Sequence, residues 1–438
     1  MTMEALGQRL RRLRLERGKT QSQIAGPYSA GYVSQVESGR KVPSSAALRQ
    51  FADCLGVSLK ELTDGVPPDL EPEIRMRLQE GWRDVYLGRF DQARKAFAAC
   101  ERDARPYRFE ALRARALVGR AWCTERQGQT GDAMELFEEA RRVFDESSPA
   151  PAAAEAVAGI ARCHQLAGST RVALYVLETY LLDLKREELP DPTALMRTFA
   201  SLVWPYCELG LWQQAGQAAE NALRLQGRVQ EPEEIAGMHV NVARVLLREG
   251  RTESAMCSLD KAEEIYRDLN WRTEIARTQT SKGIVLIERG DLEAARTELQ
   301  AALETFRVVG FLREEGRTLN ELARLSRLLG HLDEARALAQ QALELLSEME
   351  AVPALALAHR ELALVMHSQD STAAGDHFRA AIELYEKCGE ATHAADTYRL
   401  LGELLEAQND STASKEAYHA GLRLIARDLD RADGEART

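Results

Sequence analysis

A glycine recurs along most of this chain at a spacing of 40 residues, with one interval of 42. The seven positions are Gly88, Gly128, Gly168, Gly210, Gly250, Gly290 and Gly330. An alanine stands five residues after each glycine, at Ala93, Ala133, Ala173, Ala215, Ala255, Ala295 and Ala335. Two antiparallel helices joined by a tight turn approach closely only where small side chains face each other. The pattern therefore predicts an all-α chain of successive helical hairpins.

Small residues also precede the turns. Seven positions before each glycine stand Gly81, Ala121, Ala161, Val203, Ala243, Gly283 and Ala323. Asp370 and Asp410 continue the 40-residue spacing beyond Gly330. They can replace glycine there because aspartate also tolerates the turn conformation that glycine supplies. The period thus predicts about nine hairpins.

This order of small residue, glycine turn and alanine resembles the tetratricopeptide repeat, over roughly residues 70–425. The resemblance implies a right-handed α-solenoid in which the first helix of each hairpin lines the concave surface. The usual unit has about 34 residues, so the longer unit here is expected to have longer helices and loops. HEAT-type repeats have a closer period but lack the glycine–alanine signature.

The chain changes character before Pro67 and Pro68. Residues 1–66 contain 10 Lys or Arg and 6 Asp or Glu, a net charge of +4, although the whole chain carries −11. A small basic head on a large acidic body indicates two tasks. We expect a head at residues 1–66, a linker at 67–73, a repeat domain at 74–428 and a flexible tail at 429–438.

Five short helices are expected in the head. Thr20 and Gln23 form a capping-box pattern, and Ser29 can cap a following helix that Gly39 ends. The stretches TQSQIA, SAGYVSQVESGRK and LRQFADCLGVSLKEL resemble the phage-repressor and xenobiotic-response-element type of helix-turn-helix domain, over about residues 4–64. In that family the second helix of the motif lies in the DNA major groove.

The resemblance also implies which residues contact DNA. Ala30, Gly31 and Gln35 correspond to base-contacting positions, of which Gln35 alone has a strong hydrogen-bonding side chain. Gln21, Arg40 and Lys41 correspond to phosphate contacts, whereas Tyr32 and Ser34 could face the backbone or the core. Specificity would then depend partly on thymine methyl groups or DNA shape. The predicted DNA-binding set is Gln21, Ser29, Ala30, Gly31, Tyr32, Ser34, Gln35, Arg40 and Lys41.

The turn between the two helices of this motif is short. Only Gly26, Pro27 and Tyr28 separate Ala25 from Ser29, about two residues fewer than in typical members of the family. Proline cannot continue a helix, so the first helix must stop near Ala25. We interpret the segment as a tightened turn that leaves DNA binding intact. The alternative is a head that has lost this activity.

The expected concave face of the repeats is rich in arginine. The residues selected by counting back from each turn are Arg162, Arg197, Asn241, Arg244, Arg277, Arg317, Asn320, Arg324, Arg327 and Arg360. Arginine forks bind carboxylates, so this groove could hold an acidic peptide or a free C-terminus. Alternatively, the arginines form solvated faces with glutamate partners on neighbouring turns.

Three tryptophans and one proline have two interpretations each. Trp82, Trp122 and Trp204 share the position six residues before the turn, where core packing is favoured over an apolar groove floor. Pro205 lies within an expected helix and should kink it, either as a hinge or as a tolerated bend.

Several functions find no support in the sequence. The seven cysteines are scattered without a Cys-x-x-Cys pair, as is usual for reduced thiols in a cytoplasmic protein. The eight histidines lack metal-binding spacing, and no phosphate-binding or nucleophile motif occurs. We therefore expect no enzyme activity, metal or cofactor. There is also no leader or membrane-spanning segment.

The two parts together resemble the peptide-responsive quorum-sensing regulators of bacteria. That resemblance implies a cytoplasmic, homodimeric transcription regulator that binds operator DNA and a peptide or protein ligand. One alternative is an interaction scaffold that binds a protein partner, with the head serving only as a DNA tether. The other is an adaptor that no longer binds DNA.

Overall fold

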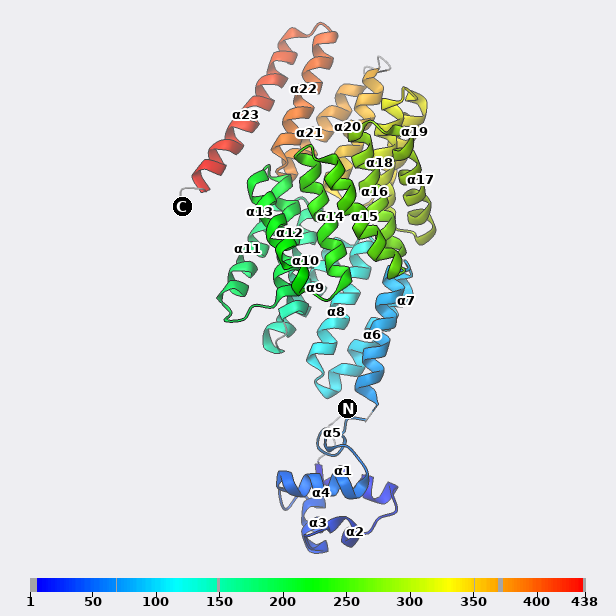
Figure 1. Cartoon of the computed structure of the whole chain (residues 1–438), viewed down its shortest axis with the longest axis vertical. Coiled ribbons are helices and arrows are strands. Elements are labelled where there is room, and N and C mark those ends of the chain that lie inside the picture. Colours follow the sequence, from blue (N-terminus) through cyan, green and yellow to red (C-terminus); the bar gives the residue numbers. More distant parts are fainter. Residues whose placement is uncertain (1–5, 68, 148–149, 350, 369–372, 436–438) are drawn as a thin grey trace.

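The computed structural model describes residues 6–67, 69–147, 150–349, 351–368 and 373–435. These residues form 23 α-helices, arranged as a small head and a long body of stacked hairpins (Figure 1). This is the all-α class that the glycine period predicts. None of the helices in the described ranges is long and apolar enough to span a bilayer.

The head contains five helices among its described residues. They are α1 (Leu6–Glu16), α2 (Gln21–Ala25), α3 (Ala30–Glu37), α4 (Ser45–Leu55) and α5 (Leu59–Asp64). Apolar side chains from all five, including Leu10, Val33 and Phe51, pack into one core. The predicted caps form: the Thr20 hydroxyl accepts a hydrogen bond from the Gln23 backbone N–H, the Thr20 backbone N–H donates in return to the Gln23 side-chain oxygen, and Ser29 caps α3.

The short turn in the head is well packed. Helix α2 ends at Ala25, as Pro27 predicts, and the backbone N–H of Tyr28 bonds to the Ala25 carbonyl at 2.9 Å. The Tyr28 ring stacks on Tyr32 of α3, with ring centroids 5.0 Å apart, and meets Phe51 of the core edge-on. The turn is thus an integral part of the head's core.

The body consists of nine hairpins of consecutive helices within the described residues. The first four pairs are α6 (Leu70–Tyr86) and α7 (Phe90–Ala104), α8 (Glu110–Arg126) and α9 (Thr130–Ser147), α10 (Ala150–Leu166) and α11 (Thr170–Arg186), and α12 (Pro192–Glu208) and α13 (Trp212–Leu225). The remaining pairs are α14 (Pro232–Arg248) and α15 (Thr252–Asp268), α16 (Arg272–Arg289) and α17 (Leu292–Val309), α18 (Leu312–Leu328) and α19 (Leu332–Ser347), α20 (Val352–Ser368) and α21 (Ala374–Cys388), and α22 (Ala391–Ala407) and α23 (Ser411–Glu435).

Two helices extend beyond the expected boundaries. Helix α6 begins at Leu70, inside the segment expected to be a linker. Helix α23 continues to Glu435, beyond the expected end of the repeats at residue 428. Helix α12 continues through Pro205, and the expected kink there stays a prediction.

The turns have the predicted backbone conformation. All seven recurring glycines lie in the left-handed region, with φ between 72° for Gly210 and 88° for Gly290. The prediction for the last hairpin was wrong by one residue, because Asn409 rather than Asp410 has positive φ (64°). Asp410 instead caps α23 by accepting a hydrogen bond from Ala413. Asp370 lies outside the described residues.

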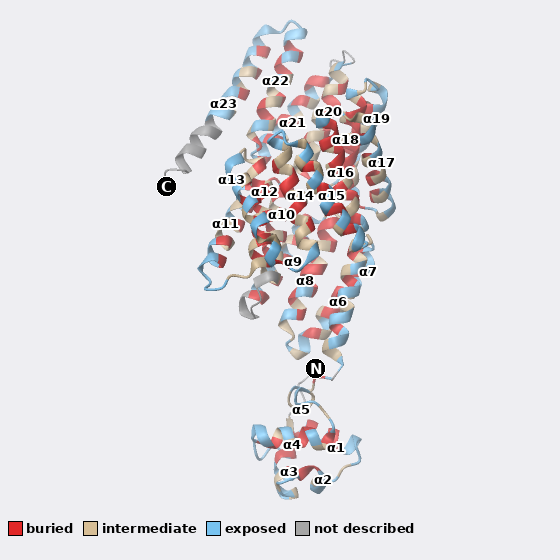
Figure 2. Cartoon of the chain, viewed as in Figure 1, coloured by how far each residue is buried: buried red, intermediate tan, exposed pale blue. Residues whose placement is uncertain are grey.

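Small residues set the helix spacing, as predicted. The seven alanines that follow the turn glycines are fully buried. In Figure 2, buried residues gather where the stacked helices face one another. Gly81 of α6 lies so close to Phe97 of α7 that a Cβ atom there would come within 2.8 Å of the ring. Close approach between helices therefore depends on these positions.

The superhelix is tight enough for hairpins five units apart to touch. The turn at Gly88 lies against Val309 at the end of α17, and the turn at Gly168 lies against Cys388 at the end of α21. The first and second hairpins also share one apolar core with Phe306 and Phe311 from the sixth and seventh. We call this contact between successive superhelical turns the seam.

The seam predicts that two turn glycines respond differently to alanine. An added Cβ at Gly88 would lie 2.4 Å from Val309, whereas at Gly250, with a similar φ of 73°, it would meet nothing within 4 Å. Gly250→Ala should cost only the left-handed backbone penalty, about 1–2 kcal/mol. Gly88→Ala should cost about 1–3 kcal/mol more, from overpacking. Urea unfolding of both variants measures the difference, and equal losses would contradict the seam.

Candidate functional site

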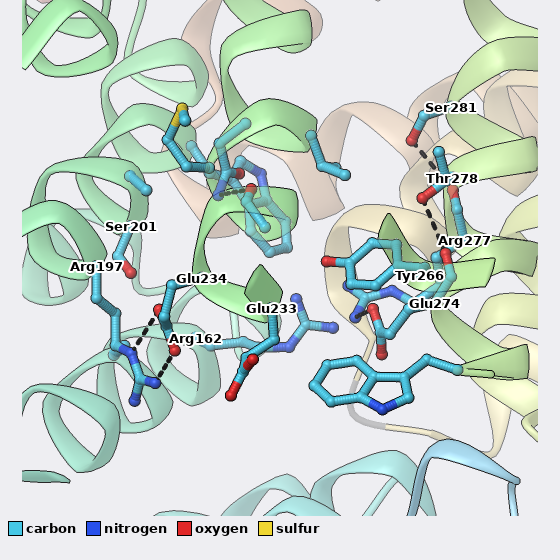
Figure 3. A pocket seen from close by; sticks show the side chains of 18 of the residues that line it. Arg162, Arg197, Ser201, Glu233, Glu234, Tyr266, Glu274, Arg277, Thr278 and Ser281 are labelled. Carbon is cyan, nitrogen blue, oxygen red and sulfur yellow. Dashed lines mark hydrogen bonds and ion pairs between the residues drawn. The ribbon is translucent and has the colours of Figure 1, made fainter. Parts of the chain in front are cut away.

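The first helices of seven hairpins enclose a channel inside the superhelix. Its central part, which we call the charged chamber, has a volume of about 310 Å³. Residues from α6, α8, α10, α12, α14, α16 and α18 line it. Figure 3 shows some of them, among them Ser201 of α12 and Glu233 of α14. Arg162 and Arg197, for example, reach it from α10 and α12, while Glu274 and Arg277 enter from α16. The predicted concave surface therefore lines a partly open cavity inside the superhelix.

Aromatic rings form much of the chamber wall. Tyr86 stacks on Trp271, with ring planes 8° apart, at the place where the first hairpin meets the sixth. Trp82 and Trp122 each pack edge-on against a core phenylalanine, Phe97 and Phe137 respectively. The favoured interpretation of these tryptophans as core residues was incomplete, because all three predicted tryptophans are half-buried and also line the chamber.

A network of buried charges runs through the wall and across the seam. Arg313 of α18 forms an ion pair with Glu125 of α8, and each side chain is 1% exposed. Arg162 binds the same carboxylate at 3.1 Å. Arg126 of α8 donates to Glu274 of α16 at 2.7 Å. These pairs connect the second hairpin to the sixth and seventh.

The arginines keep these buried acids ionised. Burial alone would raise the pKa of Glu125, but the charges of Arg162 and Arg313 outweigh it and lower the pKa to about 2. Glu314 is similar: burial opposes ionisation, yet Arg317, Arg277 and other arginines lower its pKa to about 2. The network therefore remains fully charged near neutral pH.

Most of the predicted groove residues line the chamber. Arg162, Arg197, Asn241, Arg244, Arg277 and Arg317 do so. Arg197 binds both Glu234 and Glu155, the latter at 3.1 Å, and Arg277 binds Glu274 at 3.2 Å. The interpretation that placed glutamate partners beside the arginines thus describes the pairing well, although the pairs face a partly open channel.

The other four predicted groove residues do not line this channel. Asn320 is 1% exposed and donates a hydrogen bond to the Ala354 carbonyl at 3.1 Å. Arg327 binds Glu361 at 3.1 Å. Arg324 pairs with Glu288 and Arg360 with Asp396. Asn320, Arg324 and Arg327 lie further along α18 than Arg317, and Arg360 belongs to α20, which does not line the chamber.

Sequence reasoning missed the acidic half of the site. Glu234, Glu274 and Glu314 stand at intervals of 40 residues, sixteen positions before successive turn glycines. Their recurrence was a usable signal, because an arginine follows three residues after two of them. Arg313 and Glu125, in contrast, carried no signal, since they come from different repeat positions far apart in the chain.

In the head, the predicted DNA-contacting side chains lie mainly on one exposed surface. Gly31, Ser34 and Gln35 of α3 are exposed, as are Ser29 before it and Arg40 and Lys41 after it. Tyr32 is half-buried in the aromatic cluster, and the Lys41 ammonium lies 4.9 Å from its ring centroid. Ala30 is also half-buried.

Gln21 has an internal partner. Its amide donates to Glu37 at 2.8 Å, and Glu37 also accepts two hydrogen bonds from Arg14 of α1. Burial would raise the pKa of Glu37, but these hydrogen bonds lower it overall. This group connects α1, α2 and α3, and so fixes the orientation of α3 relative to the shortened α2.

Family comparisons agree with both parts of the fold. Residues 5–64 match the family model of a helix-turn-helix domain. Residues 78–151 and 274–348 each match a tetratricopeptide repeat model. The chain thus combines an N-terminal helix-turn-helix domain with tetratricopeptide repeats. No curated protein sequence matched the chain.

Three solved structures resemble this chain to different extents. A Rap protein complexed with Competence and Sporulation Factor is 14% identical, has a TM-score of 0.60, and aligns over 82% of this chain and 99% of its own. The apo form of RapI is 14% identical, with a TM-score of 0.47, over 82% and 98%. PlcR of Bacillus thuringiensis, with the peptide PapR7 and DNA, is 16% identical, with a TM-score of 0.35, over 70% and 96%. The first of these likenesses establishes a shared repeat fold.

The buried network predicts a specific pH dependence. The Glu125 carboxylate titrates near 4.5 when unfolded and near 2 when folded, so its contribution is present above pH 4.5 and lost as pH falls toward 2. At neutral pH, Glu125→Gln should lower the free energy of unfolding by about 3–5 kcal/mol, because it leaves Arg313 without a carboxylate. Urea unfolding should show this gap narrowing as pH falls from 4.5 to 2.

A matched control exists on the surface. Glu220 pairs with Arg224 at 3.4 Å, and the two side chains are 63% and 69% exposed. Glu220→Gln should cost less than about 1 kcal/mol at any pH. A gap between wild type and Glu125→Gln that did not change with pH would contradict the assigned charge state.

Proposed function

We propose that this chain is a sequence-specific DNA-binding transcription regulator whose repeat channel senses a peptide and whose repeats mediate homodimerisation. The observation that carries the proposal is the exposed end of the head, where Gln35 on α3 lies beside Arg40 and Lys41. A helix of this kind can place an amide against base edges while the basic residues bind phosphates.

DNA recognition of this kind requires α3 to be held in a fixed orientation. The bonds from Arg14 and Gln21 to Glu37 hold α3 against α1 and α2, so its outer face is presented in one orientation. Tyr28 fills the space beneath the short turn by stacking on Tyr32. Preorganisation of this kind avoids an ordering cost on binding.

The channel supports peptide sensing. Its charged chamber combines arginines and glutamates with six aromatic side chains, from Trp82, Tyr86, Trp122, Trp204, Tyr266 and Trp271. Such walls suit an extended peptide, which offers backbone amides, charges and apolar side chains. The Rap protein of the same fold was solved in complex with Competence and Sporulation Factor.

Dimerisation would connect the two parts. One helix-turn-helix head covers too little DNA for strong specificity, so two heads on adjacent half-sites are expected. A ligand that contacts the channel walls differently in two arrangements of the hairpins would shift the population between them. The spacing of the heads, and with it the affinity for the operator, would then change.

Two head variants test the DNA-binding part of this proposal. Gln35→Ala should relax sequence preference at one base position, at a cost of about 1–3 kcal/mol for the preferred sequence. Arg40→Ala should weaken binding to all sequences and reduce the salt slope by about 1. Selection from randomised DNA, followed by titration at several salt concentrations, measures both effects, with Arg224→Ala as an exposed control outside the head.

The outcomes separate the competing functions. An unchanged sequence preference for Gln35→Ala would show that α3 is not the reading helix. No selection by a folded wild-type protein would instead favour a scaffold whose repeats bind a partner without reading DNA.

A further inference from the structure

Arg244 differs from the other arginines of the charged chamber. Of the six arginines that line it, five form ion pairs with described residues, and Arg244 forms none. Its Nη1 atom is buried without a hydrogen-bond partner. The residue as a whole is half-buried, and a partly desolvated guanidinium without an ion-pair partner is costly, so this arrangement points to an anion that arrives from outside.

The surroundings of Arg244 hold it in place. Its guanidinium lies over the face of Trp204, 5.0 Å from the ring centroid, and Arg162 covers the same ring at 5.6 Å. Burial lowers the pKa of Arg244 relative to a free arginine, and the charges of Arg317 and Arg277 act in the same direction, whereas Cys207 and Glu208 offset the shift only in part. An arginine with this pKa remains charged at neutral pH.

Arg244 stands at the boundary of a second space. This apolar chamber, also of about 310 Å³, shares Trp204, Arg244, Ile284 and Arg317 with the charged chamber. Leu166, Cys207, Pro353 and Leu357 form its apolar wall. In the other direction, the charged chamber shares Tyr86, Arg197 and Trp271 with a wider mouth of about 930 Å³. The three spaces are therefore neighbours inside the superhelix, with shared residues between them.

Three carboxylates line the apolar chamber, and none of them is paired with Arg244 among the described residues. Glu208 accepts a hydrogen bond from Thr170 at 2.9 Å, and burial raises its pKa to about 7. Glu390 lies 3.2 Å from the His393 ring nitrogen. Burial also raises the pKa of Glu321.

We propose that Arg244 binds the free C-terminal carboxylate of a peptide whose last side chain is apolar and fills the apolar chamber. The assignment rests on the proposed peptide-sensing function. A C-terminal residue carries a carboxylate and a side chain on one Cα, which matches a cation beside an apolar space. The preceding residues would run through the charged chamber, past Ser201 and Asn241, toward the mouth.

Paired peptide libraries test this assignment directly. Short random peptides that end in leucine are prepared as free acids and as C-terminal amides, and are recovered on the full-length protein by affinity selection. Wild type should retain the acids about tenfold or more over the amides, because a charge-assisted hydrogen bond is lost on amidation. Arg244→Leu should abolish that preference, while the exposed control Arg224→Leu should keep it.

A stability measurement guards against a misfolded variant. Because Arg244→Leu removes an unpaired buried charge, its unfolding midpoint without peptide should equal or exceed that of wild type. A large drop would mean that Arg244 has a structural role, and would overturn the assignment. The acid–amide comparison on wild type stands independently of the variant.

The remaining outcomes separate this inference from the proposed function. Equal retention of acids and amides by wild type would overturn the carboxylate assignment and leave peptide sensing intact. No retained peptide of either kind would overturn peptide sensing itself. Decanoic acid serves as a third probe, and binding of this acid through Arg244 without any retained peptide would assign the site to a lipid-derived carboxylate instead.

Discussion

The ion pair between Arg313 and Glu125 is the interaction on which the shape of the body depends. It joins the seventh hairpin to the second, at a point where both side chains are almost completely buried. Arg313 also donates to Thr130 at 3.1 Å, so its charge is supported by more than one acceptor. Two charges removed from water are tolerated only with such geometry, and loss of either partner would leave the other uncompensated.

Closure of the superhelix follows from this contact and creates the channel. A solenoid that stacks only neighbouring hairpins leaves an open concave face, whose arginines would be solvated. Here the sixth and seventh hairpins return to the first and second, so the arginine-lined face becomes an interior. The same closure raises the cost of any unpaired charge inside, which is why Arg244 is informative and the exposed arginines are not.

The local architecture could be read from the sequence, but its long-range closure could not. The glycine period gave the hairpins and their turns, because backbone conformation and close helix contact are local requirements at Gly88, Gly168 and their equivalents. The positive φ of Asn409 was not predicted, because its turn is displaced by one residue from the period. The pairing of Arg313 with Glu125 depends on superhelical pitch, which accumulates over five hairpins and leaves no periodic trace. For the same reason, Arg327 and Arg360 fit the groove register yet lie outside the channel.

The head obeys simpler rules, since its caps and core are specified within a few residues. The proposed function depends most on the exposed face of α3 and on Arg40 and Lys41 after it. A gel-shift titration of the intact protein against the DNA upstream of its own gene, at moderate salt, tests it most directly. We predict that the protein retards the upstream DNA and does not retard scrambled DNA of the same composition. Equal binding to both DNAs, with the head shown to be folded, would contradict it.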